Sequence, residues 1–258
     1  MESFDRILYE KMPTGVAFVR INNPENRNAL DVPLRKEMTR ALETAAEDAA
    51  VRVIILCGVG DHFCAGGDIK SMGDFTSREA RERIALAHKP IRLIQNLEKP
   101  VIAMVHGFAA GAGMNITLAC DLIVAADDTR FIQGFVRIGL IPDVGGLYFL
   151  PRLIGIHRAK ELVFSGGRLD AREAAELGLV NRVVPRQDLE KETLKLAESL
   201  AEGPGFVLGI MKKMMNKGLD CSLDTFLEME AGLQALCFNS DENREGVQAF
   251  LEKRKPRF

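Results

Sequence analysis

Two stretches of the chain share one plan, in which an apolar strand is followed by a loop of small residues. They read VIILCGVGDHFCAGGD over residues 53–68 and VIAMVHGFAAGAGMN over residues 101–115. Uninterrupted apolar strands of this kind are typical of a sheet that is buried on both faces, and helical patterns stand between them. The repeated plan therefore predicts an α/β fold made of βα-type units.

The rest of the chain agrees with this plan up to about residue 188 and then changes character. Residues 6–10 and 15–21 read as a β-hairpin, and residues 33–48 place Leu34, Met38, Leu42 and Ala45 on one helical face. Further patterns predict a helix over 77–97, a short helix after the second loop, and a strand over 122–126.

Only helical patterns follow residue 188. We expect a core over residues 1–196 and a helical region over residues 197–258, and the two should pack together because no low-complexity linker separates them.

Composition excludes several classes of protein. The formal net charge of −2 provides no overall field to attract nucleic acid or an anionic membrane. The five cysteines show no CxxC pairing, which favours reduced thiols and a cytoplasmic location. We expect neither a secretion signal nor a membrane span, because no apolar run approaches about 18 residues.

The two small-residue loops carry the first chemical signal. Nothing larger than a methyl group intrudes at residues 65–67 and 111–113, so the backbone can approach a ligand closely. The second loop runs directly into a predicted helix, whose free N–H groups favour an anion or an oxyanion. The alternative is that these residues only permit tight turns. Phosphate binding is a rival use, but neither loop has the pattern of a P-loop or a dinucleotide fingerprint.

The sequence supports neither a metal site nor a cysteine nucleophile. His62, His106 and His157 are scattered without metal-ligand spacing, and Cys64 has no obvious partner base. We therefore expect no metal and no cofactor bound by the protein.

Seven blocks in register resemble the enoyl-CoA hydratase/isomerase, or crotonase, superfamily. They are NPENRNALD, HFCAGGDIKSM, KPVIAMVHGFAAGAGM, ACDLIVAADDTRF, IGLIPDVGGLYFLPRLIG, GRLDAREAAELGLVNRVV and FLEKRK. The resemblance implies a crotonase-like spiral of repeated ββα units with a C-terminal helical trimerisation region. It also implies a homotrimer or a hexamer made of two trimers, and an acyl-CoA substrate whose thioester oxygen is held by the backbone N–H groups of Gly67 and Ala112.

The same resemblance shows where this chain departs from the hydratases. Asn115 and Phe135 stand where those enzymes have their two glutamates, and neither can transfer a proton. The remaining acid is Asp143, at a position where some enoyl-CoA isomerases have their catalytic aspartate. We expect Asp143 to move a proton from C2 to C4 of a 3-enoyl-CoA, with Phe135 as an apolar wall that raises the carboxyl pKa. The alternative for Asp143 is an N-cap of the following helix.

Substrate-binding positions follow from the resemblance and from the loops. They are Asn28, Ala29, Leu30, Ala65, Gly66, Gly67, Asp68, Ile69, Gly111, Ala112, Asn115, Phe135, Pro142 and Lys253. Lys253 would offer a cation to a coenzyme A phosphate, whereas Asp68 has helix capping as its alternative role.

Three other functions stay open. A hydratase would need a non-standard acid, and a hydrolase would use Asp143 as nucleophile with His88 as the base that activates water. The hydrolase branch also uses a tryptophan, and this chain has none. A catalytically silent acyl-CoA binder would show the same loss of both glutamates. An RNA-binding relative would need a basic helix, but residues 34–48 carry three basic and four acidic side chains.

Overall fold

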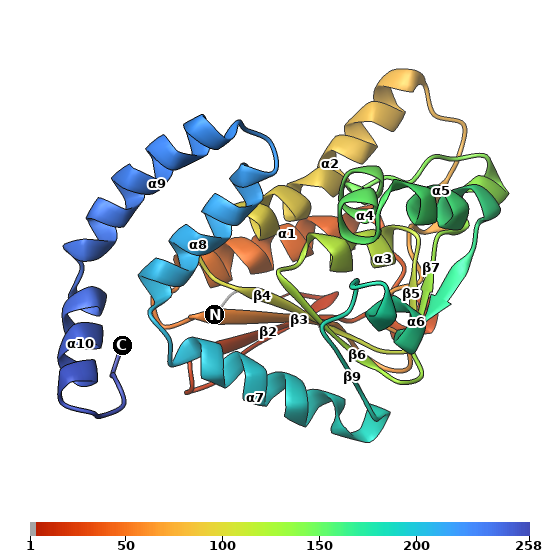
Figure 1. Ribbon diagram of the computed structural model, residues 1–258. Helices are drawn as coiled ribbons and strands as arrows, with labels where there is room; N and C mark the ends of the chain where they lie inside the picture. Colours follow the sequence, from red (N-terminus) through yellow and green to blue (C-terminus); the bar gives the residue numbers. More distant parts are fainter. Residues whose placement is uncertain (1–3) are drawn as a thin grey trace.

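The computed structural model describes residues 4–258, whose strands form two sheets (Figure 1). The larger sheet has six strands in the order β1-β2-β3-β4-β6-β9, and the smaller has three in the order β5-β7-β8. The strands are β1 Ile7–Lys11, β2 Val16–Ile21, β3 Val53–Gly58, β4 Val101–Val105, β5 Phe108–Ala110, β6 Leu122–Ala126, β7 Arg130–Ile132, β8 Arg168–Asp170 and β9 Arg182–Val184.

Helices lie between the strands as far as β9, and from there to the end of the chain only helices follow. They are α1 Val32–Glu47, α2 Ser77–Asn96, α3 Ala112–Ala119, α4 Gly146–Ile154, α5 Ile156–Ser165, α6 Ala171–Glu176, α7 Leu189–Ala201, α8 Gly205–Gly218, α9 Leu223–Phe238 and α10 Asp241–Leu251. The hairpin, the helix over 77–97 and the run of C-terminal helices are therefore confirmed.

The strand pairing gives the chain its spiral course. β1 and β2 form the antiparallel hairpin, and β2, β3, β4, β6 and β9 are parallel neighbours. After β4 the chain adds β5 to the small sheet and then forms α3; after β6 it adds β7 to the same small sheet. Two strands followed by a helix thus recur, as the resemblance to the crotonase superfamily implies, whereas the repeated plan in the sequence alone predicts only βα-type units.

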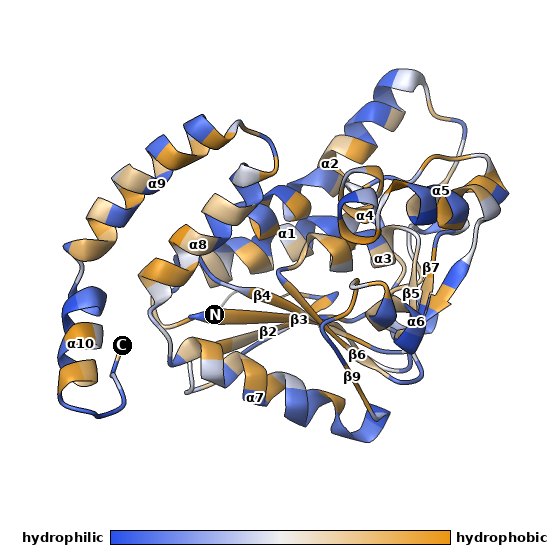
Figure 2. Cartoon of the chain, viewed as in Figure 1, coloured by the Kyte–Doolittle hydropathy of each residue, from blue (hydrophilic) through white to orange (hydrophobic). Residues whose placement is uncertain are grey.

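The large sheet is covered on both faces. Ala17 and Val19 of β2 belong to the core cluster that includes α1, whereas Val16 and Phe18 point to the opposite face, in the cluster that includes α7. Alternation along a strand places successive side chains on opposite faces, so both helical layers bury apolar surface. Figure 2 shows the strands between these layers in the colours of hydrophobic residues.

A buried ion pair connects the C-terminal helices to the core. Lys212 of α8, which is buried, lies 2.7 Å from a carboxylate oxygen of Asp121 and donates a hydrogen bond to the carbonyl of Lys99. Asp121 in turn accepts a hydrogen bond from the backbone N–H of Val101 at the start of β4. Because breaking a buried pair leaves an uncompensated charge, this contact ties α8 to the sheet.

Beyond α8, the helices have little to pack against in a single chain. α9 contains no buried residue, and it exposes large apolar side chains such as Leu223, Leu227 and Phe238. Figure 1 shows α9 and α10 outside the body formed by the two sheets and their covering helices. Residue 196 lies within α7, which packs on the sheet, and the division expected at that residue stays a prediction. None of the helices in residues 4–258 is long and apolar enough to span a membrane.

Candidate active site

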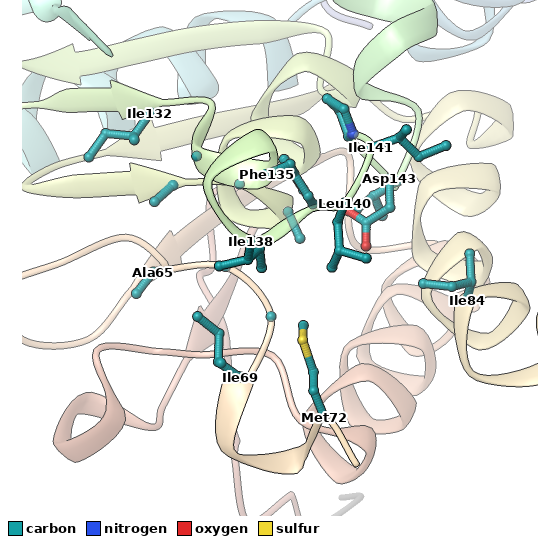
Figure 3. Close-up of a pocket in the computed structure, with 18 of the residues that line it drawn as sticks. Ala65, Ile69, Met72, Ile84, Ile132, Phe135, Ile138, Leu140, Ile141 and Asp143 are labelled. Atoms are coloured by element: carbon teal, nitrogen blue, oxygen red, sulfur yellow. The ribbon is translucent and has the colours of Figure 1, made fainter. Parts of the chain in front are cut away.

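A cavity of about 520 Å³ lies between the two small-residue loops, α1, α2 and the segment that precedes α4. Its walls are mainly apolar, and Figure 3 shows Ile69, Met72, Ile84, Ile138 and Leu140 around it. This size and lining are typical of a site for a small organic ligand.

The backbone joins the two loops at the edge of the cavity. Cys64 and Ala109 form an isolated parallel bridge, and the N–H of Ala110 donates to the carbonyl of Cys64 at 2.9 Å. Gly66 has a φ of +100°, and a Cβ placed there would lie 2.8 Å from the carbonyl oxygen of Ala110 and 3.6 Å from the backbone nitrogen of Ala112. Glycine at this position therefore lets the loops approach each other, as the sequence predicted.

Two N–H groups beside the cavity remain unused by the fold. The N–H groups of Gly67 and Ala112 donate no hydrogen bond to any acceptor in residues 4–258, and both residues line the cavity. Ala112 is the first residue of α3, so the positive end of the helix dipole stands behind its N–H. Such a pair can stabilise an oxygen that gains negative charge during a reaction.

Asp143 presents its carboxylate to the same cavity. Figure 3 shows this carboxylate pointing into the space between Leu140 and Ile84. Its Oδ1 is buried and has no hydrogen-bond partner among the described residues. Burial raises the pKa of this carboxyl, an effect that the charges of Arg35 and His88 partly offset. α4 begins at Gly146, and no side chain caps it, so the alternative reading of Asp143 as an N-cap is wrong.

Asn115 holds the turn that carries Asp143. Its Nδ2 donates to the carbonyl of Asp143 at 2.9 Å, and its Oδ1 accepts a hydrogen bond from Gln133 Nε2 at 2.7 Å. A Cβ at Gly146 would lie 2.3 Å from Asn115 Nδ2, so the turn packs directly on the amide. Val144 has a φ of +49°, a strained conformation for a β-branched residue, and it adjoins Asp143. Asn115 therefore lies beneath the site and fixes the backbone of Asp143.

Phe135 stands where the sequence predicted an apolar wall. Its ring would contact a Cβ at Gly111 at 3.4 Å, and the ring lines the cavity with Ile138 and Leu140. Ile138, Leu140 and Ile141 are also exposed to solvent on this side of the chain. The wall is thus continuous with an apolar outer surface.

The structure brings most of the predicted site residues to one place. Those that line the cavity are Ala65, Gly66, Gly67, Ile69, His88, Gly111, Ala112, Phe135, Pro142 and Asp143.

The remaining predicted substrate-binding positions do not line this cavity, and these are Asn28, Ala29, Leu30, Asp68, Asn115 and Lys253. Asn28 is fully buried, accepts a hydrogen bond from the N–H of Asn23 and donates to the carbonyls of Val59 and His62, so it joins its own loop to the loop that follows β3. Asp68 caps the short helix Ile69–Ser71 by accepting from the N–H of Lys70, as its alternative reading stated. Lys253 follows α10 and is exposed. Contacts of these residues with the coenzyme A part of a substrate stay predictions.

Two arginines in the cavity wall were not anticipated. Arg35 of α1 and Arg83 of α2 both line the cavity, and Arg35 is only 4% exposed. Arg35 stands three and seven residues before Met38 and Leu42, on the helical face that the apolar pattern already marked as buried. This spacing could have marked the stem of Arg35 as buried, but it does not indicate that the guanidinium faces a cavity.

Comparisons with known proteins bear on both the fold and the site. A family model described as enoyl-CoA hydratase/isomerase matches residues 11–258. A crotonyl-CoA hydratase of Syntrophomonas wolfei subsp. wolfei is 38% identical, covering 99% of this chain and 98% of that protein. A 1,2-epoxyphenylacetyl-CoA isomerase of Escherichia coli (strain K12) is 36% identical, covering 95% of each.

A solved structure gives the corresponding result for the fold. The crystal structure of an enoyl-CoA hydratase from Bacillus anthracis superposes with a TM-score of 0.94 at 34% identity, covering 98% of this chain and 99% of that one. The crotonase-like spiral with C-terminal helices is therefore confirmed. A hydratase and an isomerase are both similar to this chain, so similarity alone does not distinguish the two reactions.

Proposed function

The chain belongs to the enoyl-CoA hydratase/isomerase family, and from that premise we propose that it converts a 3-enoyl-CoA into a 2-enoyl-CoA with Asp143 as its single acid-base group. The observation that carries this proposal is that Asp143 provides the one carboxylate among the described residues that line the cavity. A double-bond shift needs one group that removes and returns a proton, whereas hydration also needs a group that activates water.

The proposed reaction starts with the thioester oxygen between the N–H groups of Gly67 and Ala112. The ionised carboxylate of Asp143 takes a proton from C2, and the electrons of that C–H bond form a dienolate whose negative charge rests on the thioester oxygen. The two N–H groups stabilise this charge more than they stabilise the neutral carbonyl. Asp143 then returns the proton to C4, which leaves the double bond between C2 and C3.

The surroundings of Asp143 suit this task. A carboxyl whose pKa is raised by burial is a stronger base once it is ionised, and its apolar walls keep competing water away from the dienolate. The hydrogen bond from Asn115 and the strained turn at Val144 fix the backbone from which the carboxylate projects. The proposal requires no cofactor beyond the coenzyme A that the substrate carries.

Hydration is a second candidate, because a crotonyl-CoA hydratase is among the similar proteins. It would require Asp143 both to activate water and to handle the proton at C2, since Asn115 and Phe135 carry no acid. Hydrolysis is a third, because His88 of α2 lines the same cavity as Asp143. In that reaction Asp143 would attack the thioester carbonyl and expel coenzyme A as a thiolate, and His88 would activate the water that hydrolyses the resulting acyl anhydride.

Assembly and location complete the proposal. The exposed apolar residues of α9 and α10, among them Leu227, Phe238 and Phe250, favour a trimer or a hexamer in which neighbouring chains cover them. All five cysteines are free, which favours a reducing compartment such as the cytoplasm.

The deciding experiment compares the natural protein with Asp143→Asn, using two thioesters to measure turnover and one to measure binding. We expect isomerisation of 3-hexenoyl-CoA by the natural protein and its loss in the variant, while calorimetry shows binding of hexanoyl-CoA nearly unchanged, because the amide keeps the shape of the carboxyl. Asp128→Asn, which removes a carboxylate outside the cavity, is the matched control and should remain active. Efficient hydration of crotonyl-CoA would refute the isomerase proposal and show that the protein is a hydratase. Release of free coenzyme A that depends on both Asp143 and His88 would replace the proposal with the third candidate, and no turnover at all would indicate a silent binder.

A further inference from the structure

The Arg35 guanidinium is a buried cation that forms no ion pair with a carboxylate of residues 4–258. No carboxylate of residues 4–258 lies within 4.0 Å of it, and it makes one long hydrogen bond, from Nη1 to the carbonyl of Arg83 at 3.4 Å. Its Nε is buried without any acceptor. Most arginines buried to this degree are paired with a carboxylate, because an unpaired buried charge is costly.

The position of Arg35 relates it to the bound substrate. A Cβ at Gly67 would lie 3.7 Å from Arg35 Nη2, so the guanidinium stands next to the loop residue that offers an N–H to the thioester oxygen. No hydrogen bond of Nη2 to any described residue is formed, and Arg35 lines the cavity. An anion on the acyl group could therefore reach this nitrogen from inside the cavity.

A second cation increases the excess of positive charge. Arg83 also lines the cavity, donates a hydrogen bond to the hydroxyl of Ser71, and lies over the ring of Phe75. Arg35 and Arg83 together face the single carboxylate of Asp143. One additional negative charge from a ligand would balance the two arginines.

We propose that Arg35, with Arg83 beside it, binds a carboxylate on the acyl group, so that the preferred substrates are coenzyme A thioesters of short dicarboxylic acids. This inference rests on the proposed acyl-CoA function of the same cavity. A short acyl group is required because the guanidinium lies close to Gly67, where the thioester end is held. A planar guanidinium can bind a carboxylate through two parallel hydrogen bonds, which an alkyl group cannot form.

Saturated thioesters test this proposal by binding alone. Glutaryl-CoA and pentanoyl-CoA have acyl chains of equal length and differ in a terminal carboxylate, and neither has a double bond to shift. We expect calorimetry to show that the natural protein binds glutaryl-CoA about 10- to 100-fold more tightly than pentanoyl-CoA, the effect of a hydrogen bond to a charged group. Adipoyl-CoA and hexanoyl-CoA extend the comparison, and the preference should decline for the longer pair.

Variants assign the preference to Arg35. Arg35→Met keeps an unbranched side chain up to the position of Nε, without the charge, and should bind the two thioesters equally, whereas Arg35→Lys should keep part of the preference. Arg20→Met is the matched control, because Arg20 pairs with Glu190 away from the cavity, and it should keep the full preference.

Two results would overturn the proposal. The first is equal binding of glutaryl-CoA and pentanoyl-CoA by the natural protein, a comparison that needs no variant to fold. The second is an Arg35→Met protein that weakens both ligands by the same factor, since Arg35 would then support the site as a whole. Isomerisation of uncharged 3-hexenoyl-CoA decides the proposed function separately, so the two failures are distinguishable.

Discussion

Replacing Asn115 with alanine should damage catalysis more than binding. Asn115 is fully buried and touches no part of the cavity, yet it joins Gln133 to the carbonyl of Asp143. The shorter side chain removes both hydrogen bonds and leaves the turn free to move against α3.

The size of the effect follows from these contacts. Each lost hydrogen bond costs about 1 kcal/mol, and a buried amide of Gln133 left without its partner adds about 1–3 kcal/mol. Gln133 Oε1 already lacks a partner, so this side chain cannot compensate by rotation. The carbonyl of Asp143 keeps its hydrogen bond from the N–H of Gly146. We therefore expect the free energy of unfolding to fall by about 3–5 kcal/mol and kcat to fall about 100-fold, as a displacement of about 1 Å can cause.

Chemical denaturation and steady-state kinetics with 3-hexenoyl-CoA measure the two effects. Thr117→Val is the matched control, because Thr117 is buried in the same helix and bonds only the carbonyl of Met114. The control should lose about 1 kcal/mol of stability and keep its kcat. If Asn115→Ala lowers the free energy of unfolding but leaves kcat unchanged, the amide of Asn115 does not position Asp143.

The remaining predictions concern the oxyanion donors, the base and the assembly. Ala112→Pro should lower kcat about 100-fold or more with little loss of stability, because proline suits the first position of a helix and removes the N–H donor. Ala112→Gly keeps the N–H group and should stay active. A proline variant with full activity would contradict the role of the Ala112 N–H as an oxyanion donor. The kcat/KM of the natural protein should rise with pH through a pKa above the ordinary aspartate value, because the ionised form of Asp143 is the base and burial raises its pKa. Arg35→Met should move that rise to higher pH, since the cation lowers the pKa, and an unmoved profile would show that Arg35 does not affect Asp143. Light scattering should give the mass of a trimer or hexamer, and a monomer would refute the assembly.

The pattern of apolar and small residues along the sequence is sufficient to predict most of the architecture. The face formed by Leu34, Met38, Leu42 and Ala45 is buried as expected, because a helical period is a property of neighbouring residues and does not depend on the fold around it. The small-residue loops are predictable for a similar reason, since only glycine permits the φ of Gly66 and the close approach of the loops.

The features that could not be predicted arise from contacts between segments that are far apart in the sequence. Arg35 enters the cavity because α1 meets α2 and the first loop there, and no periodic pattern tells an arginine that reaches solvent from one that faces a cavity. The resemblance predicts Asn115 as a substrate-binding residue because its position matches a glutamate of the hydratases. Its amide instead bonds to the carbonyl of Asp143, a contact between residues that lie 28 positions apart.

The left-handed backbone at Val144 shows how packing can hold a strained turn in place. At a φ of +49° a glycine would be free of the clash of about 1–2 kcal/mol that the valine suffers. The valine side chain is buried in the hydrophobic core, however, and burial of such a side chain is worth about 1.5–3 kcal/mol, which offsets the clash. Glycine would also give the loop a wider range of conformations beside Asp143. A chain that keeps valine there places the carboxylate narrowly without a net loss of stability, so a change to glycine should lower turnover and should not raise the melting temperature.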